Sequence, residues 1–303
     1  MGSPAWRKRR SGKTIAVGGG KGGVGKTLVA VNLAVAVSRM GIEVSLFDGD
    51  LGNSNCNTLL GITRVRKSLD HYLARECAFS EITMATAYPG LSLICGAPNS
   101  VGELLPDGMP RLLNELRRCK AECLILDLGA GVGEETLDLY RLAEEKIVVA
   151  TPEVTSLQNA YGFVKSAFLL DLQRSGGWET YLEAAGSDVQ KLHAMIEELE
   201  PRHPHRRMFA AVAARQNFGL LGNRVDDDKD ERIIQNLRKV VAQYLRLESR
   251  VSGLIGTREE VRESVNRIIP FTALHPDSHP SREISRMAAA LFPAGPSEGT
   301  AGI

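Results

Sequence analysis

The sequence predicts a single doubly wound α/β domain, with a mostly parallel sheet and helices on both faces of that sheet. Short apolar runs typical of buried strands alternate along the chain with helical patterns. A glycine-rich turn directly follows the first of these runs and precedes an apolar helix pattern. The 303 residues are enough for one large domain with a well-buried core, or for two small domains.

Composition limits the classes of partner and the compartment. The formal net charge is +1 and 24% of residues are charged, so no global field attracts nucleic acid or membranes. Five cysteines form no C-x-x-C pair, which predicts reduced thiols in the cytoplasm. No apolar run is long enough to span a membrane. We expect residues 1–12 to be a disordered basic tail and residues 293–303 to be a disordered polar tail.

The glycine-rich turn has the form G-x-x-x-x-G-K-T, between a strand at 14–17 and a helix at 28–40. Glycines let successive backbone N–H groups converge on phosphate oxygens, and the helix N-terminus adds its positive end. Lys26 would reach the terminal phosphates of a nucleotide, and the Thr27 hydroxyl would hold Mg²⁺. The predicted nucleotide-binding residues of this phosphate loop are Gly20, Gly22, Gly23, Val24, Gly25, Lys26 and Thr27.

Two further apolar strands end in carboxylates. The strand at 44–47 leads to Asp48 and Asp50, and the stretch C-L-I-L-D-L-G leads to Asp127 and Gly129. Ligands of open α/β sheets bind at the carboxyl ends of the strands. Asp127 is therefore placed to hold Mg²⁺ through water, and Gly129 is expected near the terminal phosphate. The ligands that we predict are ATP and Mg²⁺.

A second lysine, Lys21, precedes Lys26 by five residues and gives K-G-G-V-G-K-T. With this lysine the chain resembles the deviant Walker A ATPases of the MinD/ParA family, over residues 13–292. The segments L-D-L-G-A-G and T-P-E-V-T-S-L-Q-N-A-Y-G-F-V-K-S are similar to the FlhG/FleN branch, which sets the number and place of flagella. The resemblance implies the P-loop NTPase fold of the SIMIBI class, with a helical insertion at about 171–215.

The resemblance also implies roles for particular residues. ATP would join two copies of the chain into a homodimer, in which Lys21 crosses to the partner's nucleotide. Asp50 would polarise the attacking water. The implied catalytic residues are Lys21, Lys26 and Asp50, the implied metal-site residues are Thr27, Asp48 and Asp127, and Asn223 and Arg224 would lie near the adenine base. Family members usually carry a proline after the last strand, where Gly256 stands here, so the base contacts are left open.

The activity that the resemblance implies is slow ATP hydrolysis, working as a dimerisation switch that positions or regulates a polar or cell-surface assembly. The protein partner or activator is not identified by the sequence. Membrane-bound members end in an amphipathic helix, and the FlhG branch often begins with a D-Q-A segment that activates a GTPase. Neither feature is present in the residues given, so we expect neither membrane cycling nor that partner.

The rest of the chain supplies further expected elements. Short helices are expected at 69–74 and 79–86, a helix at 110–119, and strands at 91–94, 147–150, 218–223 and 251–255. Within the insertion, helices at 179–185 and 189–199 precede a P-R-H-P-H-R-R turn. An amphipathic helix at 229–250 has a buried stripe of Ile233, Leu237, Val240, Tyr244 and Leu245. A last helix is expected at 281–291.

Two other functions stay open. A basic line of Arg232, Lys239 and Arg246 on the helix at 229–250 could bind DNA phosphates non-specifically, as in a ParA-type partition ATPase. We favour a solvated helix face instead. The second alternative is a metabolic ATPase or ligase of the same superclass. No cysteine follows Cys123, which disfavours a metal-cluster carrier with paired cysteines.

Overall fold

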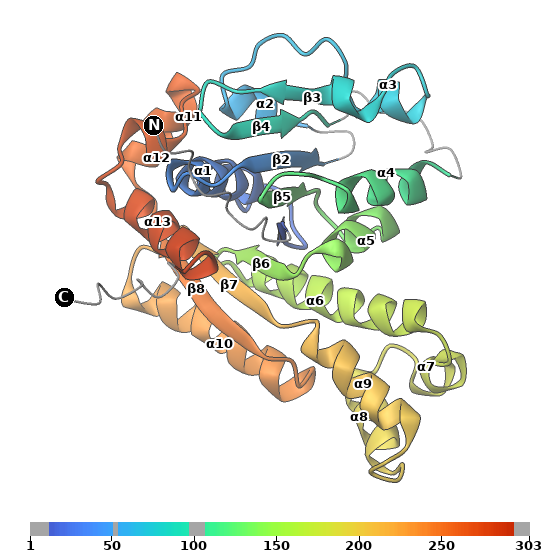
Figure 1. Ribbon diagram of the computed structural model, residues 1–303. Helices are drawn as coiled ribbons and strands as arrows, with labels where there is room; N and C mark the ends of the chain where they lie inside the picture. The colour runs from blue at the N-terminus through green and yellow to red at the C-terminus, as the bar shows by residue number, and fades with distance from the viewer. Residues whose placement is uncertain (1–11, 51–53, 97–106, 294–303) are drawn as a thin grey trace, which may run out of the picture.

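The computed structural model describes residues 12–50, 54–96 and 107–293 (Figure 1). Eight strands form one sheet in the order β3-β4-β2-β5-β1-β6-β7-β8, and every neighbouring pair is parallel except β3 with β4. The strands are β1 (Lys13–Gly18), β2 (Val44–Gly49), β3 (Thr83–Ala85), β4 (Leu91–Ile94), β5 (Cys123–Leu128), β6 (Glu145–Ala150), β7 (Phe218–Asn223) and β8 (Ser249–Ile255). The mostly parallel sheet is as predicted.

Helices cover both faces of the sheet, as Figure 1 shows. One apolar core packs α4 (Gly108–Arg117), α5 (Glu134–Leu142), α6 (Val154–Ser175) and α10 (Asp228–Tyr244) on one face. A second core packs α1 (Lys26–Arg39) and α13 (His279–Leu291) on the other face. The smaller elements are α2 (Cys56–Leu59), α3 (Leu69–Leu73), the 3-10 helix η1 (Phe79–Ile82), α11 (Glu259–Arg267) and α12 (Phe271–Leu274).

The prediction of a helix at 79–86 is wrong in its second half. The 3-10 helix η1 ends at Ile82, and β3 follows as a short edge strand. Residues 83–85 pair antiparallel with 92–94 of β4, so the ladder to β4 supplies backbone hydrogen bonds that a helix would have formed internally. The sequence predicted β4 correctly but left its antiparallel neighbour out.

The amphipathic helix expected at 229–250 is also too long. Helix α10 ends at Tyr244, and β8 begins at Ser249. Leu245 and Leu247 are both buried, a spacing of two that suits extended chain, and Arg246 between them has a left-handed φ of 54°. The Arg246 guanidinium forms an ion pair with Glu197. Arg246 therefore does not extend a helical face shared with Arg232 and Lys239, and the predicted basic line is interrupted.

The insertion is a small helical layer at the end of α6, at the bottom of Figure 1. It contains α7 (Glu179–Ala185), α8 (Val189–Glu197) and α9 (Pro204–Ala214). The predicted turn at P-R-H-P-H-R-R is wrong from Pro204 onward, since this proline occupies the first turn of α9, where its missing N–H has no role. The fully buried Trp178 packs between Tyr181, His205 and Phe209 and joins these helices.

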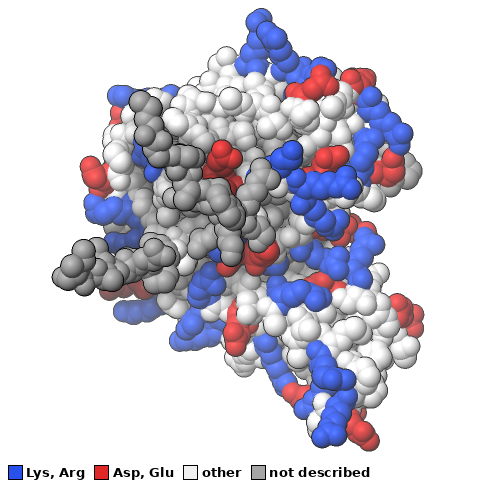
Figure 2. All heavy atoms as spheres, in the orientation of Figure 1, with Lys and Arg blue, Asp and Glu red and all other residues white. Residues whose placement is uncertain are grey.

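The surface charges are mixed. On the face in Figure 2, Lys and Arg side chains gather along one side, over α3, α4 and α5, with Asp and Glu side chains among them. Arg75 forms an ion pair with Asp107 between the ends of α3 and α4, and Arg174 forms one with Asp138 that joins α6 to α5. Across the described residues, no helix combines the length and apolar character that crossing a bilayer requires. The predicted tails at 1–12 and 293–303 lie almost wholly outside the described residues.

Candidate functional site

The phosphate loop connects β1 to α1 at the carboxyl edge of the sheet. Gly25, which precedes α1, has a left-handed φ of 98°, and a Cβ there would lie 2.4 Å from Asn223 Nδ2. A Cβ on Gly20 would lie 2.1 Å from the carbonyl oxygen of Asn159 on α6. Lys26 opens α1, and its Nζ donates to the Lys21 carbonyl oxygen at 3.1 Å. The loop is therefore packed so closely that only glycine fits at these two positions.

Residues at the end of β7 hold this loop from the other side. The Asn223 amide donates to the Val24 carbonyl oxygen at 2.8 Å. The Arg224 guanidinium donates to the Gly23 carbonyl oxygen at 3.0 Å. Both contacts join β7 to the loop backbone, about two hundred residues away in sequence. Gly256, which follows β8, packs against Val225. A Cβ at position 256 would lie 3.1 Å from the Val225 carbonyl oxygen.

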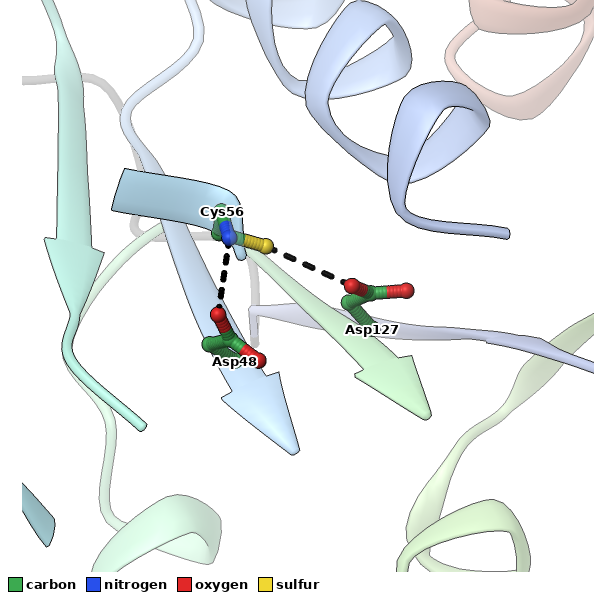
Figure 3. Close-up of side chains that lie close together, drawn as sticks. All are labelled: Asp48, Cys56 and Asp127. Atoms are coloured by element: carbon green, nitrogen blue, oxygen red, sulfur yellow. Dashed lines mark hydrogen bonds between the residues drawn. The ribbon is translucent and has the colours of Figure 1, made fainter. Parts of the chain in front are cut away.

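Two buried carboxyl groups lie side by side at the ends of β2 and β5 (Figure 3). Asp48 is 1% exposed, and its Oδ2 accepts from the Ser54 hydroxyl, the Asn55 N–H and the Cys56 N–H at 2.6, 3.0 and 2.8 Å. Asp127 is fully buried, and its Oδ2 accepts from the Cys56 thiol at 3.4 Å. Asp127 Oδ1 has no hydrogen-bond partner within the described chain.

The electrostatics of this pair favour a bound cation. Burial and the adjacent Asp48 raise the pKa of Asp127 to about 8, although a hydrogen bond with Thr27 opposes this. Burial also raises the pKa of Asp50, and burial lowers the pKa of Lys26 despite the two acids near it. An orphaned carboxylate oxygen beside a second carboxylate is the ligand set that Mg²⁺ prefers. The residues present therefore fit a magnesium ion.

Cys56 completes the buried cluster as a hydrogen-bond donor. Burial, followed by the charges of Asp48 and Asp127, holds the pKa of the Cys56 thiol well above its ordinary value, so the thiol keeps its proton. Oxygen ligands suit magnesium and a protonated thiol does not. Sequence reasoning missed Cys56, because its partner Asp127 lies 71 residues away along the chain. Its only signal was its place six residues after Asp50.

Asp50 and Gly129 lie together beyond the ends of β2 and β5. Asp50 is half-buried, and a Cβ on Gly129 would lie 3.1 Å from Asp50 Oδ1. The absent side chain at Gly129 therefore leaves room for the Asp50 carboxylate. The sequence placed both residues at this edge of the sheet, and the structure brings them into contact distance.

The two lysines of the loop differ in their surroundings. Lys26 is 7% exposed and lies near Asp50 and Asp127. The Lys21 ammonium donates to Glu153 Oε2 and to the Thr155 hydroxyl, both at 2.9 Å, and its side chain is 36% exposed. Sequence reasoning did not identify Glu153 or Thr155 as its partners. The signal available was the T-P-E-V-T segment, which follows β6 at the same edge of the sheet.

A glycine loop between a strand and a helix, with acids at the ends of two neighbouring strands, defines a nucleotide-binding domain of the P-loop type. Comparison with known families is more specific. Residues 15–271 match the CobQ/CobB/MinD/ParA nucleotide-binding domain, and the chain belongs to this family.

Individual relatives agree with the family. The antiactivator FleN of Pseudomonas aeruginosa is 34% identical over 158 residues, which is 50% of this chain and 55% of FleN. The flagellum site-determining protein YlxH of Helicobacter pylori is 31% identical over 159 residues, 50% of this chain and 53% of YlxH. The matched region thus spans about half the length of these two curated relatives.

Solved structures show the fold over nearly the whole chain. The septum site-determining protein MinD of Pyrococcus horikoshii, in complex with Mg-ADP, superposes with a TM-score of 0.67 at 21% identity. The superposition covers 93% of this chain and 96% of that protein. The P-loop NTPase fold predicted from the sequence is confirmed.

Proposed function

We propose that this chain is an ATP-driven dimerisation switch that hydrolyses ATP slowly. The observation that carries the proposal is the separation of the two lysines. Lys26 is enclosed by the loop that would hold a nucleotide. Lys21 lies outside it, where Glu153 and Thr155 hold an ammonium that is still partly exposed. A lysine placed in this way is free to serve the nucleotide of a second copy once these two contacts are released.

The roles of the other residues follow from their surroundings. Lys26 would neutralise the terminal phosphates, and because burial lowers its pKa, negative charge beside it would favour its ammonium form. Thr27 and Asp127 would hold Mg²⁺, which when bound supplies positive charge to the phosphates. Asp48 would contribute its charge while it anchors the start of α2 through three hydrogen bonds. Asn223 and Arg224 would keep the loop in its binding conformation.

Asp50 would orient and polarise the attacking water. Its carboxylate is half-buried and adjoins Gly129, and burial raises its pKa, which strengthens it as a proton acceptor. The ammonium of Lys21, brought by the second copy, would stabilise the charge that develops on the phosphate oxygens. Hydrolysis would then depend on assembly, and loss of the terminal phosphate would release the dimer.

The names of two relatives support a role in spatial organisation. One is a flagellum site-determining protein and the other an antiactivator, and each matches about half of this chain. We propose that the switch acts on a polar or cell-surface assembly of the flagellar type, through a protein partner or activator.

A test of the switch uses Asp50→Ala, with Asp107→Ala as a matched control on the surface. We expect wild type and both variants to form a dimer with Mg-ATP in light scattering. Phosphate release by Asp50→Ala should fall by at least about a hundredfold, and that of Asp107→Ala should not change. If wild type stays monomeric with Mg-ATP, or Asp50→Ala keeps the wild-type rate, the proposal is wrong in that part.

A further inference from the structure

Cys56 donates hydrogen bonds to both of the buried carboxyl groups at the strand ends (Figure 3). Its backbone N–H lies 2.8 Å from Asp48 Oδ2, and its thiol sulfur lies 3.4 Å from Asp127 Oδ2. The two acids are register partners on the neighbouring strands β2 and β5, so they lie side by side. One residue at the start of α2 therefore links the two acids.

The start of α2 fixes where this thiol lies. Cys56 is the first residue of α2, where a backbone N–H has no acceptor within the helix. Asp48 Oδ2 supplies that acceptor, and it also accepts from the Ser54 hydroxyl and the Asn55 N–H. Because the chain before α2 is held at these three points, the buried thiol reaches Asp127 from a fixed position.

The two oxygens of Asp127 have different surroundings. Oδ2 accepts from the Cys56 thiol, whereas Oδ1 has no partner among the described residues and points away from Cys56 in Figure 3. The hydroxyl of Thr27, in the phosphate loop, also hydrogen-bonds this carboxyl group. With Oδ2 occupied by the thiol, Oδ1 is the oxygen that remains for a cation or for one of its waters.

We propose that Cys56 is a positioning residue for the metal site, because its thiol occupies Asp127 Oδ2 and leaves Oδ1 for Mg²⁺ or for a water bound to it. The inference rests on the proposed function, which places Mg²⁺ at Asp127. Groups that hydrogen-bond a metal-binding side chain orient it, and their loss typically lowers metal affinity about ten- to a hundredfold. A thiol is a weak donor, so we expect the lower end of that range.

A role for Cys56 in packing alone predicts a different order of variants. The side chain lies in the apolar core that contains α1, where a free cysteine can act as a small apolar group. Valine is apolar and cannot donate a hydrogen bond, whereas serine is polar and can. If packing alone matters, Cys56→Val is the mild change and Cys56→Ser the severe one. A positioning thiol gives the reverse order for metal affinity.

The test measures binding of Mn²⁺, which like Mg²⁺ prefers oxygen ligands, to the full chain with saturating ADP. Electron paramagnetic resonance reports the free ion, and ADP alone is the reference. We expect the wild-type complex to bind Mn²⁺ more tightly than ADP alone does. Cys56→Val should weaken this affinity about tenfold, and Cys56→Ser should stay within about threefold of wild type. Neither hydrolysis nor dimerisation is needed for this measurement.

The matched control is Cys123→Val. Cys123 is also fully buried, and it lies on the same strand as Asp127 but at the other end of that strand. We expect its Mn²⁺ affinity to stay within about twofold of wild type, because the change is distant from the metal site. Denaturant unfolding without ligands shows whether each variant folds, and Cys56→Ala replaces Cys56→Val if the valine variant does not.

The outcomes separate this inference from the proposed function. If Cys56→Val keeps the wild-type Mn²⁺ affinity, or if Cys56→Val and Cys56→Ser lose it equally, the thiol does not position Asp127, and the proposed function still stands. If wild type with ADP binds Mn²⁺ no more tightly than ADP alone, the metal site of the proposed function is wrong as well. A loss in Cys56→Val that Cys56→Ser and Cys123→Val do not share supports the positioning role.

Discussion

Asp127 and Asp171 are buried to the same degree, at 0% and 2% exposure, but in opposite surroundings. Asp171 lies on α6, and its Oδ1 accepts from Arg141 Nε at 2.6 Å. Its Oδ2 accepts from Gln216 Nε2 at 2.9 Å and from Arg215 Nε at 3.4 Å. Asp127 has a second carboxyl group and a thiol as neighbours, and one of its oxygens has no partner within the described part of the chain.

These surroundings indicate different roles: Asp171 stabilises the fold, whereas Asp127 is placed to bind a ligand. The carboxylate of Asp171 is completed by the chain itself, and it joins α5, α6 and the end of α9, where the insertion ends. The carboxyl group of Asp127 has one oxygen without a partner among the described residues, and burial beside Asp48 raises its pKa to about 8. A buried polar group that lacks a partner costs free energy unless a ligand completes it.

The largest expected effect is on hydrolysis in Asp127→Asn. Mg²⁺-dependent phosphate release should fall at least about a hundredfold, because the amide removes a ligand of the proposed metal. The free energy of unfolding without ligands should hardly change at pH 7, because the carboxyl group there is mostly neutral already. Denaturant unfolding and a phosphate-release assay check both parts. If Asp127→Asn lowers the free energy of unfolding but hydrolyses ATP at the wild-type rate, Asp127 stabilises the fold and does not bind the metal.

Asp171→Asn should show the opposite pattern. The change removes charge-assisted hydrogen bonds to Arg141 and Arg215, each partly exposed, so we expect a loss of about 2 kcal/mol in the free energy of unfolding. ATP binding and hydrolysis should stay within about twofold of wild type, measured below the unfolding temperature. Equal stability of wild type and variant would show that the buried cluster around Asp171 does not hold the insertion in place.

The pH dependence of Mg²⁺ binding tests the state of Asp127. The carboxyl group is protonated below its pKa of about 8, so a bound cation must displace that proton. Apparent Mg²⁺ affinity in the presence of ATP should therefore rise about tenfold per pH unit from 6 to 7 and level off above about 8. Calorimetry in two buffers would report the released proton. If the Mg²⁺ affinity does not change with pH, and Asp127→Asn gives the same result, Asp127 is not the group that loses a proton when Mg²⁺ binds.

The smallest effect is expected from Glu153→Gln. It weakens one exposed contact of the Lys21 ammonium and leaves Thr155 in place, so Lys21 should be released more readily. The protein concentration for half-maximal Mg-ATP dimer should fall by about two- to fivefold, as for other exposed pairs. The matched control is Glu81→Gln, which breaks the exposed pair with Lys67 and should not alter dimerisation. Identical curves for wild type and Glu153→Gln would show that Glu153 does not hold Lys21 back.

Local patterns predicted the elements whose ends are marked in the sequence. Strands β4 and β7 begin and end where the sequence placed them, because apolar runs are bounded there by turn residues. Helix α10 was extended too far, because the apolar spacing continues through Leu245 and no glycine or proline marks the end. A left-handed Arg246 ends the helix instead, with help from an ion pair to Glu197 in another helix.

The part of the site that short sequence patterns encode, the phosphate loop and the strand ends, was predictable from the sequence. Lys26, Asp48, Asp50 and Asp127 were placed at one edge of the sheet from their own strands, and the structure brings them together there. The partners of Lys21 were not predictable, since Glu153 is 132 residues away in the chain. Contacts of that kind depend on the strand order, which no local pattern contains.

The most direct test of the switch concerns Lys21→Ala and Lys26→Ala, alone and mixed. Lys21→Ala should bind ATP as a monomer and neither dimerise nor hydrolyse, because the ammonium acts on the other copy's nucleotide in a closed site. Lys26→Ala should fail to bind ATP. In the mixture one copy holds ATP and the other still offers Lys21, so phosphate release should partly return. If Lys21→Ala alone dimerises and hydrolyses ATP like wild type, Lys21 acts on no second subunit and the proposed switch is wrong.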